Sequence, residues 1–263
     1  MKIDIVFVYF KGSLKGFYFV RWILKLYGLA GNSVIVDNSH SLDVGGEMVL
    51  KGSNRIMDFS GYLEGSQYLD SVSSQSTYTI FMNDSVDAHR FFWMSLVFCI
   101  NHTIRELKAL KGKGACLIGE SSPLKFHSVI HGQSISSCFS SYLFFAKSDF
   151  SSQFLKKYVN IVDEDTRFID GLIVSASNKV SDSYLGNLNG YLGLSREGAL
   201  GRWRHQKSND TAVLLVKAKS LILERMLPSY AVNSGGEFKC FYQLRLPRVL
   251  RAIESRLFFW LYQ

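Results

Sequence analysis

Residues 3–10 (IDIVFVYF) form an unbroken run of β-branched and aromatic residues with the length of a β-strand. Such a run is typical of a strand that is buried on both faces of a parallel sheet. Residues 14–27 carry apolar side chains at helical spacing, and a second apolar run over residues 33–37 ends in an aspartate. A strand, a helix and a strand within the first 37 residues predict a right-handed βαβ unit with two parallel strands.

The same alternation of short apolar runs and helical patterns continues along the chain. Further strands are predicted at residues 47–51, 77–82 and 115–118, and further helices at residues 59–69, 86–110 and 212–226. Residues 135–145 are interpreted as a strand that leads into the start of a helix, and residues 176–193 and 205–210 as loops, including the glycine-rich residues 186–193. We therefore expect an α/β fold, with a mostly parallel sheet flanked by helices and a helical C-terminal extension.

The composition argues against several classes of protein. With 263 residues, 47% of them apolar, the chain can bury a sizeable core, which argues against disorder. The four cysteines are far apart and show no paired spacing, so they indicate reduced thiols of a cytosolic protein rather than a zinc site or a disulfide scaffold. The N-terminus does not resemble a signal peptide, and the longest strongly apolar stretch, residues 91–100, is shorter than the ~20 residues of a membrane-spanning helix.

Polar residues end the early apolar runs. In an open parallel sheet, ligands bind in the crevice beyond the carboxyl ends of the strands. The residues that this topology brings to one edge are Tyr9, Asp37, Asn38, Gly52, Asn54, Asn83 and Asp84. Each of them alone is more typical of a turn or a helix cap than of a binding site, so the hypothesis of a binding site depends on their joint position. The sequence holds no GxxxxGK[ST] phosphate loop, no GxSxG motif and no HExxH motif.

Three short segments carry a resemblance to a known family. They are VDNS at residues 36–39, KGSN at residues 51–54 and YTIFMND at residues 78–84. In this order, after a strand and a helix, they resemble the nucleotide-sugar half of glycosyltransferases with the Rossmann-like GT-A fold. The similarity is greatest to the bacterial enzymes that build O-antigen and capsular polysaccharides, and it covers residues 1–145.

The resemblance implies a role for each polar position. Asp37 and Asn38 would contact the nucleoside, with Tyr9 beside them, and Gly52 and Asn54 would allow backbone and amide groups to approach it. Asp84, with Asn83 before it, would serve the diphosphate and a divalent metal, Mg²⁺ or Mn²⁺. The Asp-x-Asp motif usual in the family is here Asn83-Asp84-Ser85, so a single carboxylate stands at the metal position and metal dependence stays open.

Further site residues are implied outside these segments. His89 or Arg90 would contact the sugar or the leaving phosphate. Residues 136–145 resemble the segment that lines the acceptor side of the sugar pocket, which points to Ser141 and Tyr142.

Transfer of a sugar needs a base for the proton of the acceptor hydroxyl if the enzyme inverts the anomeric centre. The candidate bases in the second half of the chain are Glu224 and Asp165, the latter in the acidic run at residues 163–165. The acidic run is also typical of a solvated face or a helix start, and Glu224 could instead form a structural ion pair with Arg225.

The C-terminal residues predict an amphipathic helix with apolar residues on one face and three arginines mainly off it, over residues 246–261. Such a helix suits an anionic membrane surface, and packing on the protein's own core is the alternative. We expect residues 1–230 to form the GT-A-like domain, with a nucleotide-sugar half at 1–145 and an acceptor half at 146–230, and residues 231–263 to form the basic extension.

These observations favour a cytoplasmic glycosyltransferase, peripheral at the inner face of the membrane. It would move a sugar from a nucleoside-diphosphate sugar to a lipid-linked glycan. The net charge of +8 would attract both the anionic donor and an anionic surface. The alternatives are a non-enzymatic basic module that binds a membrane or nucleic acid, and a degenerate transferase retained as a scaffold. The cations are scattered rather than clustered, so nucleic acid is not the expected partner.

Overall fold

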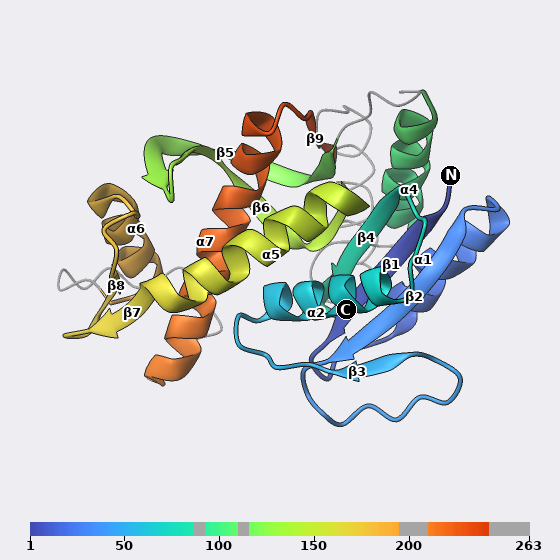
Figure 1. The fold of residues 1–263 in the computed structure, drawn as a ribbon, viewed down its shortest axis with the longest axis horizontal. Helices are drawn as coiled ribbons and strands as arrows, with labels where there is room; N and C mark the ends of the chain where they lie inside the picture. Colours follow the sequence, from blue (N-terminus) through green and yellow to red (C-terminus); the bar gives the residue numbers. More distant parts are fainter. Residues whose placement is uncertain (87–92, 110–115, 195–209, 242–263) are drawn as a thin grey trace, which may run out of the picture.

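The computed structural model describes residues 1–86, 93–109, 116–194 and 210–241. The described residues form a seven-stranded sheet with helices on both faces and a separate two-stranded hairpin (Figure 1). The strands are β1 (Ile3–Tyr9), β2 (Ala30–Asp37), β3 (Val49–Lys51), β4 (Tyr78–Asn83), β5 (Leu117–Ile130), β6 (Gln133–Lys147), β7 (Thr166–Ile169), β8 (Leu172–Ser175) and β9 (Phe238–Cys240). The helices are α1 (Lys15–Leu26), α2 (Asp58–Ser71), α4 (Trp93–Ala109), α5 (Ser148–Asp165), α6 (Asp182–Leu192) and α7 (Thr211–Asn233).

The large sheet has the strand order β3-β2-β1-β4-β6-β5-β9. Strands β3, β2, β1 and β4 run parallel, β6 is antiparallel to β4 and β5, and β9 is parallel to β5. The predicted α/β class, with a mostly parallel sheet between helices, is therefore confirmed. Tyr9 pairs with Asp37 on one side of β1 and Val8 pairs with Asn83 on the other, so the polar ends of three strands meet at one edge.

The sheet separates two hydrophobic clusters because successive side chains of a strand point to opposite faces. Along β1, Val6 and Val8 belong to the cluster covered by α2, α5 and α7, whereas Ile5 and Phe7 belong to the cluster covered by α1 and α4. Both faces of β1 are thus buried, which explains why its sequence is apolar throughout rather than alternating.

Helix α2 approaches the sheet closely through two glycines. A Cβ atom on Gly61 would lie 2.7 Å from Val8 Cγ2, and one on Gly65 would lie 2.3 Å from Val6 Cγ1. Both glycines lower intrinsic helix propensity, yet they bring the start of α2 against the carboxyl end of β1. The helix predicted at residues 59–69 is confirmed, and these contacts explain why it tolerates the two glycines.

We expect Gly65→Ala to lower the free energy of unfolding by about 1–3 kcal/mol, because the new methyl group would overpack against Val6. The matched control is Gly186→Ala in α6, where an added Cβ meets nothing within 4 Å. There the same substitution is expected to stabilise the protein by about 0.5–1 kcal/mol through helix propensity. Denaturant unfolding of the two variants checks the pair, and equal effects would contradict the close packing of α2.

Two predictions about local structure were wrong. Residues 135–145 start no helix, because β6 continues to Lys147 and pairs with β4 over its final residues. Residues 182–192, expected as part of a loop, form helix α6. Its buried residues Tyr184, Leu188 and Leu192 recur every four positions, and Gly193 ends it in the left-handed conformation at φ 78°. The glycines and asparagines between them obscured this period.

Several expectations concern residues outside the described ranges. These are residues 87–92 and 110 of the expected 86–110 helix, residues 205–209 of the expected 205–210 loop, and the amphipathic segment at 246–261. Residues 145 and 230, where the expected segments of the chain meet, lie inside β6 and α7. Strand β9 lies within the expected C-terminal extension and pairs with β5. In the part of the chain that the structure describes, no helix combines the length and the apolar character needed to cross a bilayer.

Candidate functional site

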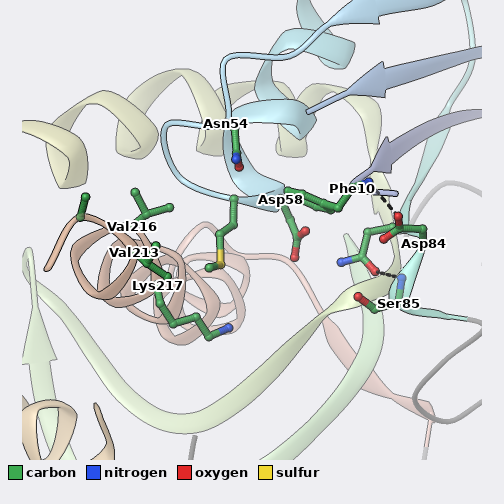
Figure 2. Close-up of a pocket in the computed structure, with 11 residues that line it drawn as sticks. Phe10, Asn54, Asp58, Asp84, Ser85, Val213, Val216 and Lys217 are labelled. Atoms are coloured by element: carbon green, nitrogen blue, oxygen red, sulfur yellow. Dashed lines mark hydrogen bonds between the residues drawn. The ribbon is translucent and has the colours of Figure 1, made fainter. Parts of the chain in front are cut away.

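A cavity of about 460 Å³ opens beyond the carboxyl ends of β1 and β4 (Figure 2). Four parts of the chain form it: the end of β1, the segment that leads into α2, the end of β4, and the first turns of α7. Its lining residues are Phe10, Asn54, Met57, Asp58, Asn83, Asp84, Ser85, Ala212, Val213, Val216 and Lys217. In the view of Figure 2, Asp58 lies between Asp84 on one side and Lys217 on the other. The cavity therefore combines two carboxylates and a cation with apolar walls.

Asp84 fixes the loop that follows β1. Its Oδ2 atom accepts hydrogen bonds from the backbone N–H groups of Phe10, at 2.7 Å, and Gly12, at 2.6 Å. Gly12 is required for this approach, because a Cβ atom there would lie 2.7 Å from the Asp84 carboxyl carbon. The predicted metal ligand is thus at the cavity, and it also holds together the ends of β1 and β4.

Asp58, at the first position of α2, was not among the predicted site residues. It is buried, and its Oδ2 atom accepts a hydrogen bond of 2.9 Å from Ser141 Oγ. Burial, the largest influence, and the charge of Glu224 raise the pKa of Asp58 to about 6, while Lys217 and hydrogen bonds from Ser141 and Asn83 act in the opposite direction. In the sequence, Asp58 has the appearance of an ordinary acid in the first turn of a helix, so only the fold distinguishes it.

Glu224 and Ser141, both predicted site residues, lie together just behind Asp58. Ser141 Oγ is 2.8 Å from Glu224 Oε1, which α7 supplies, and the Ser141 carbonyl accepts a hydrogen bond of 2.6 Å from the Tyr62 hydroxyl. Arg225, the alternative partner for Glu224, donates a hydrogen bond to Cys138 Sγ. Glu224 therefore belongs to a buried polar group that reaches the cavity through Asp58.

Asp37 lies at the expected edge of the sheet, but its carboxylate is directed into its own loop. It accepts hydrogen bonds from the Ser39 N–H, at 2.8 Å, the Ser39 hydroxyl, at 2.6 Å, and the Leu42 N–H, at 2.8 Å. Burial opposes ionisation of Asp37, and these hydrogen bonds outweigh it and lower its pKa. Asp37 is absent from the cavity lining and shapes residues 39–42 instead.

Asn38 and Gly52 form one packed unit beside the cavity. Asn38 Nδ2 donates to the Met57 carbonyl at 3.2 Å, and its buried Oδ1 atom has no hydrogen-bond partner within the described ranges. A Cβ atom on Gly52 would meet that oxygen at 1.9 Å, so glycine is required there. Of the polar residues near this turn, Asn54 reaches the cavity lining, whereas Tyr9 packs toward the cluster on the opposite face of the sheet.

Asp165 is not brought to the cavity. It ends α5 beside the β7–β8 hairpin, which lies at the far end of the molecule from β1 (Figure 1). Its carboxylate accepts hydrogen bonds from the Ser175 hydroxyl and the Ser177 N–H, each of 2.6 Å. Burial acts against these bonds, which lower the pKa of Asp165. In the same acidic run, Asp163 Oδ1 pairs with Lys219 Nζ at 2.6 Å, so both side chains hold structural contacts.

The remaining predicted residues lie elsewhere. Tyr142 packs toward the α1 and α4 face, opposite Ser141, because neighbouring residues of a strand alternate. His89 and Arg90 lie outside the described residues. Over residues 1–86, 93–109, 116–194 and 210–241, no group of three or more His, Cys, Asp or Glu side chains is arranged to hold a metal ion.

No family model and no curated protein matches this chain. Two solved structures show a distant similarity in the course of the chain. One is 4-diphosphocytidyl-2C-methyl-D-erythritol synthase, at 10% identity and a TM-score of 0.36, covering 60% of this chain and 80% of that one. The other is 2-C-methyl-D-erythritol 4-phosphate cytidylyltransferase from Thermus thermophilus, at 10% identity and a TM-score of 0.34, covering 97% of this chain and 98% of that one. The fold class follows from the strand order and strand directions of this chain itself.

Proposed function

We propose that the protein is a glycosyltransferase that uses a nucleoside-diphosphate sugar as its donor. The observation that supports this proposal most strongly is the cavity at the carboxyl ends of β1 and β4, which holds Asp58, Asp84 and Lys217. Ligands of open α/β sheets bind at this edge. A volume of about 460 Å³ falls within the usual range of pockets for small molecules and cofactors.

The lining suggests how the donor would lie. The Lys217 ammonium group would offset the charge of the diphosphate, and the Asn54 amide could hydrogen-bond to the nucleoside or the sugar. Met57, Val213 and Val216 offer apolar surface to the flat parts of the donor. Asn38 and Gly52 would shape this wall of the donor site. Asn38 donates a hydrogen bond to the Met57 carbonyl, and Gly52 leaves room for the Asn38 side chain.

A divalent cation fits this cavity only as a partner of the donor phosphates. Asp84 is the carboxylate that would contact it, and Asp84 Oδ2 already accepts two backbone N–H groups. Mg²⁺ commonly takes one or two carboxylates and completes its coordination with phosphate oxygens and water. When bound, the cation would reduce the negative charge of the leaving diphosphate.

We further propose a lipid-linked glycan as the acceptor and an anionic membrane as the surface on which the protein works. Helix α1 supports this with exposed Tyr18, Trp22 and Leu26 one turn apart, and with Lys15 and Lys25 on the same helix. Aromatic and cationic side chains together suit a membrane interface.

We expect the double variant Trp22→Ser/Leu26→Ser to sediment less with anionic vesicles, because it removes two exposed apolar side chains of α1. The control is Ile169→Ser, at an exposed apolar position on β7, which should not change sedimentation.

A screen of nucleotide sugars tests the proposed activity directly. The protein is incubated with UDP-, GDP- and dTDP-sugars, with and without Mn²⁺ and a lipid-phosphate-linked saccharide, and the released nucleotide is quantified. We expect release with one donor class and faster release when the acceptor is present. Folded protein that releases nucleotide from none of these donors would contradict the proposal.

A further inference from the structure

Ser141 bridges two buried carboxyl groups. Its Oγ atom lies 2.9 Å from Asp58 Oδ2 and 2.8 Å from Glu224 Oε1, both within hydrogen-bond distance. A serine hydroxyl carries one proton and can therefore donate to only one of the two oxygens. The second short contact is a hydrogen bond only if the other carboxyl group carries a proton and donates it to Ser141. The two contacts therefore correspond to one carboxyl proton that Asp58 and Glu224 share through the Ser141 hydroxyl.

The three groups occupy different depths of the site. Asp58 lines the cavity, whereas Ser141 and Glu224 lie behind it, and all three side chains are buried. Elements on every side contribute groups that face them. Lys217 and Arg225 of α7 contribute positive charge, and Asp84 after β4 contributes negative charge. Asn83 of β4 donates toward Asp58, and the Tyr62 hydroxyl of α2 donates to the Ser141 carbonyl. The Cys138 thiol of β6 and the Tyr184 hydroxyl of α6 face Glu224. Asp58 is thus the member that a ligand in the cavity can reach.

We propose that Asp58, Ser141 and Glu224 form a proton relay, in which Asp58 takes the proton of the acceptor hydroxyl and Glu224 stores it. The relay deepens the proposed function and rests on it. It adds Asp58 as the catalytic base that meets the acceptor and makes Glu224, behind Ser141, a positioning residue that holds the proton.

Each bond and proton of the transfer is accounted for. The acceptor oxygen forms a bond to the anomeric carbon while the bond from that carbon to the diphosphate oxygen breaks, and the nucleotide leaves with the bonding electrons. The acceptor O–H bond breaks and its proton passes to the Asp58 carboxylate. Asp58 then donates to Ser141 Oγ as the Ser141 proton moves to Glu224. The product state has the one shared proton that the two short contacts describe, and release of that proton to water restores the base.

A relay of this kind works only after the pair has lost its shared proton. The raised pKa of Asp58, at about 6, agrees with a pair that holds the proton in mild acid and releases it at neutral pH. Turnover should therefore rise with pH through about 6 and level off above it, since a general base acts in its deprotonated form.

Two measurements test the relay. In turnover assays, Asp58→Asn is expected to lower kcat by about 10²–10⁴-fold. Glu224→Gln and Ser141→Ala should lower kcat less and shift the acidic limb of the pH profile. Asp70→Asn, which alters an exposed acid on the same helix as Asp58, is the control and should keep the wild-type profile. An Asp58→Asn variant with wild-type kcat and pH profile would overturn the relay.

Infrared spectroscopy supplies a readout that needs no substrate. The protein without ligand should show a carboxylic acid C=O band that disappears between pH 5 and pH 7, and Asp58→Asn and Glu224→Gln should each change it. If the wild-type band is missing, the shared proton does not exist and the inference fails whatever the activity. If the band is present and no nucleotide sugar is consumed, the proton-sharing pair stands and the glycosyltransferase assignment fails, and with it the relay's catalytic role.

Discussion

Replacing Asp84 with alanine is expected to lower the free energy of unfolding by about 3 kcal/mol or more and to abolish turnover. The Asp84 carboxylate accepts two short hydrogen bonds from the N–H groups of Phe10 and Gly12. Hydrogen bonds to a charged group contribute about 1.5–3 kcal/mol each, and a buried donor left without a partner adds a desolvation cost. The loss of the loop after β1 would also deform the cavity that Phe10 and Asp84 line.

Asp84→Asn separates the structural role of this residue from its proposed role toward the diphosphate. The amide keeps an oxygen that can accept from the two N–H groups but removes the negative charge. We expect this variant to recover most of the stability and little of the turnover. Denaturant unfolding and the nucleotide-release assay provide the two readouts, with the exposed Asp43→Ala as control. Wild-type stability of Asp84→Ala would contradict the loop contacts, and wild-type turnover of Asp84→Asn would contradict the diphosphate role.

Asp58 is expected to make the protein less stable as the pH rises from 4 to 7. Its pKa is about 6 in the folded protein against an ordinary value of 3.8. A raised carboxyl pKa means that folding favours the protonated form. The contribution of Asp58 to the free energy of unfolding is therefore fully present below about pH 3.8. It is lost as the pH rises through about 6. This increase in the pKa of Asp58 corresponds to about 3 kcal/mol in the free energy of unfolding.

Comparison of Asp58→Asn with the wild type isolates this contribution. The variant cannot ionise at this position, so its stability relative to the wild type should increase by about 3 kcal/mol between pH 4 and pH 7. Asp165→Asn is the matched control with the opposite sign. The pKa of Asp165 is lowered, so its contribution is present above its ordinary pKa and is lost as the pH falls. Urea unfolding at each pH measures both, and a pH-independent Asp58→Asn difference would contradict the raised pKa.

The first half of the fold could be predicted from the sequence because its signals are local. The apolar run of β1, the helical spacing of α1 and the polar ends of β2 and β4 each lie within a few neighbouring residues. Their parallel arrangement then follows from the handedness of the βαβ unit. Helix α6 was missed because its glycines and asparagines resemble a loop, and its helical period is visible only in which side chains are buried.

The site was predicted less completely because its chemistry depends on contacts between distant residues. Asp37 and Asp84 both end strands at the same edge, yet Asp37 bonds to its own loop and Asp84 faces the cavity. Ser141 lies 83 residues after Asp58, and Glu224 lies 83 residues after Ser141. No pattern in the sequence indicates that residues so far apart are in contact. Glu224 was proposed as a base on residue type alone, whereas its link to the cavity through Ser141 required the packing of α7 against β6.

Titration calorimetry shows whether the cavity at the ends of β1 and β4 binds a nucleoside diphosphate, as proposed above. UDP, GDP and dTDP are titrated, with and without Mn²⁺, into the wild type and into two variants of α7. Val216→Trp places a large side chain in the cavity, whereas Val232→Trp makes the same change at an exposed position outside it. We predict that the wild type and Val232→Trp bind at least one nucleotide and that Val216→Trp binds none. Absence of binding to the folded wild type, or unchanged binding by Val216→Trp, would contradict the claim.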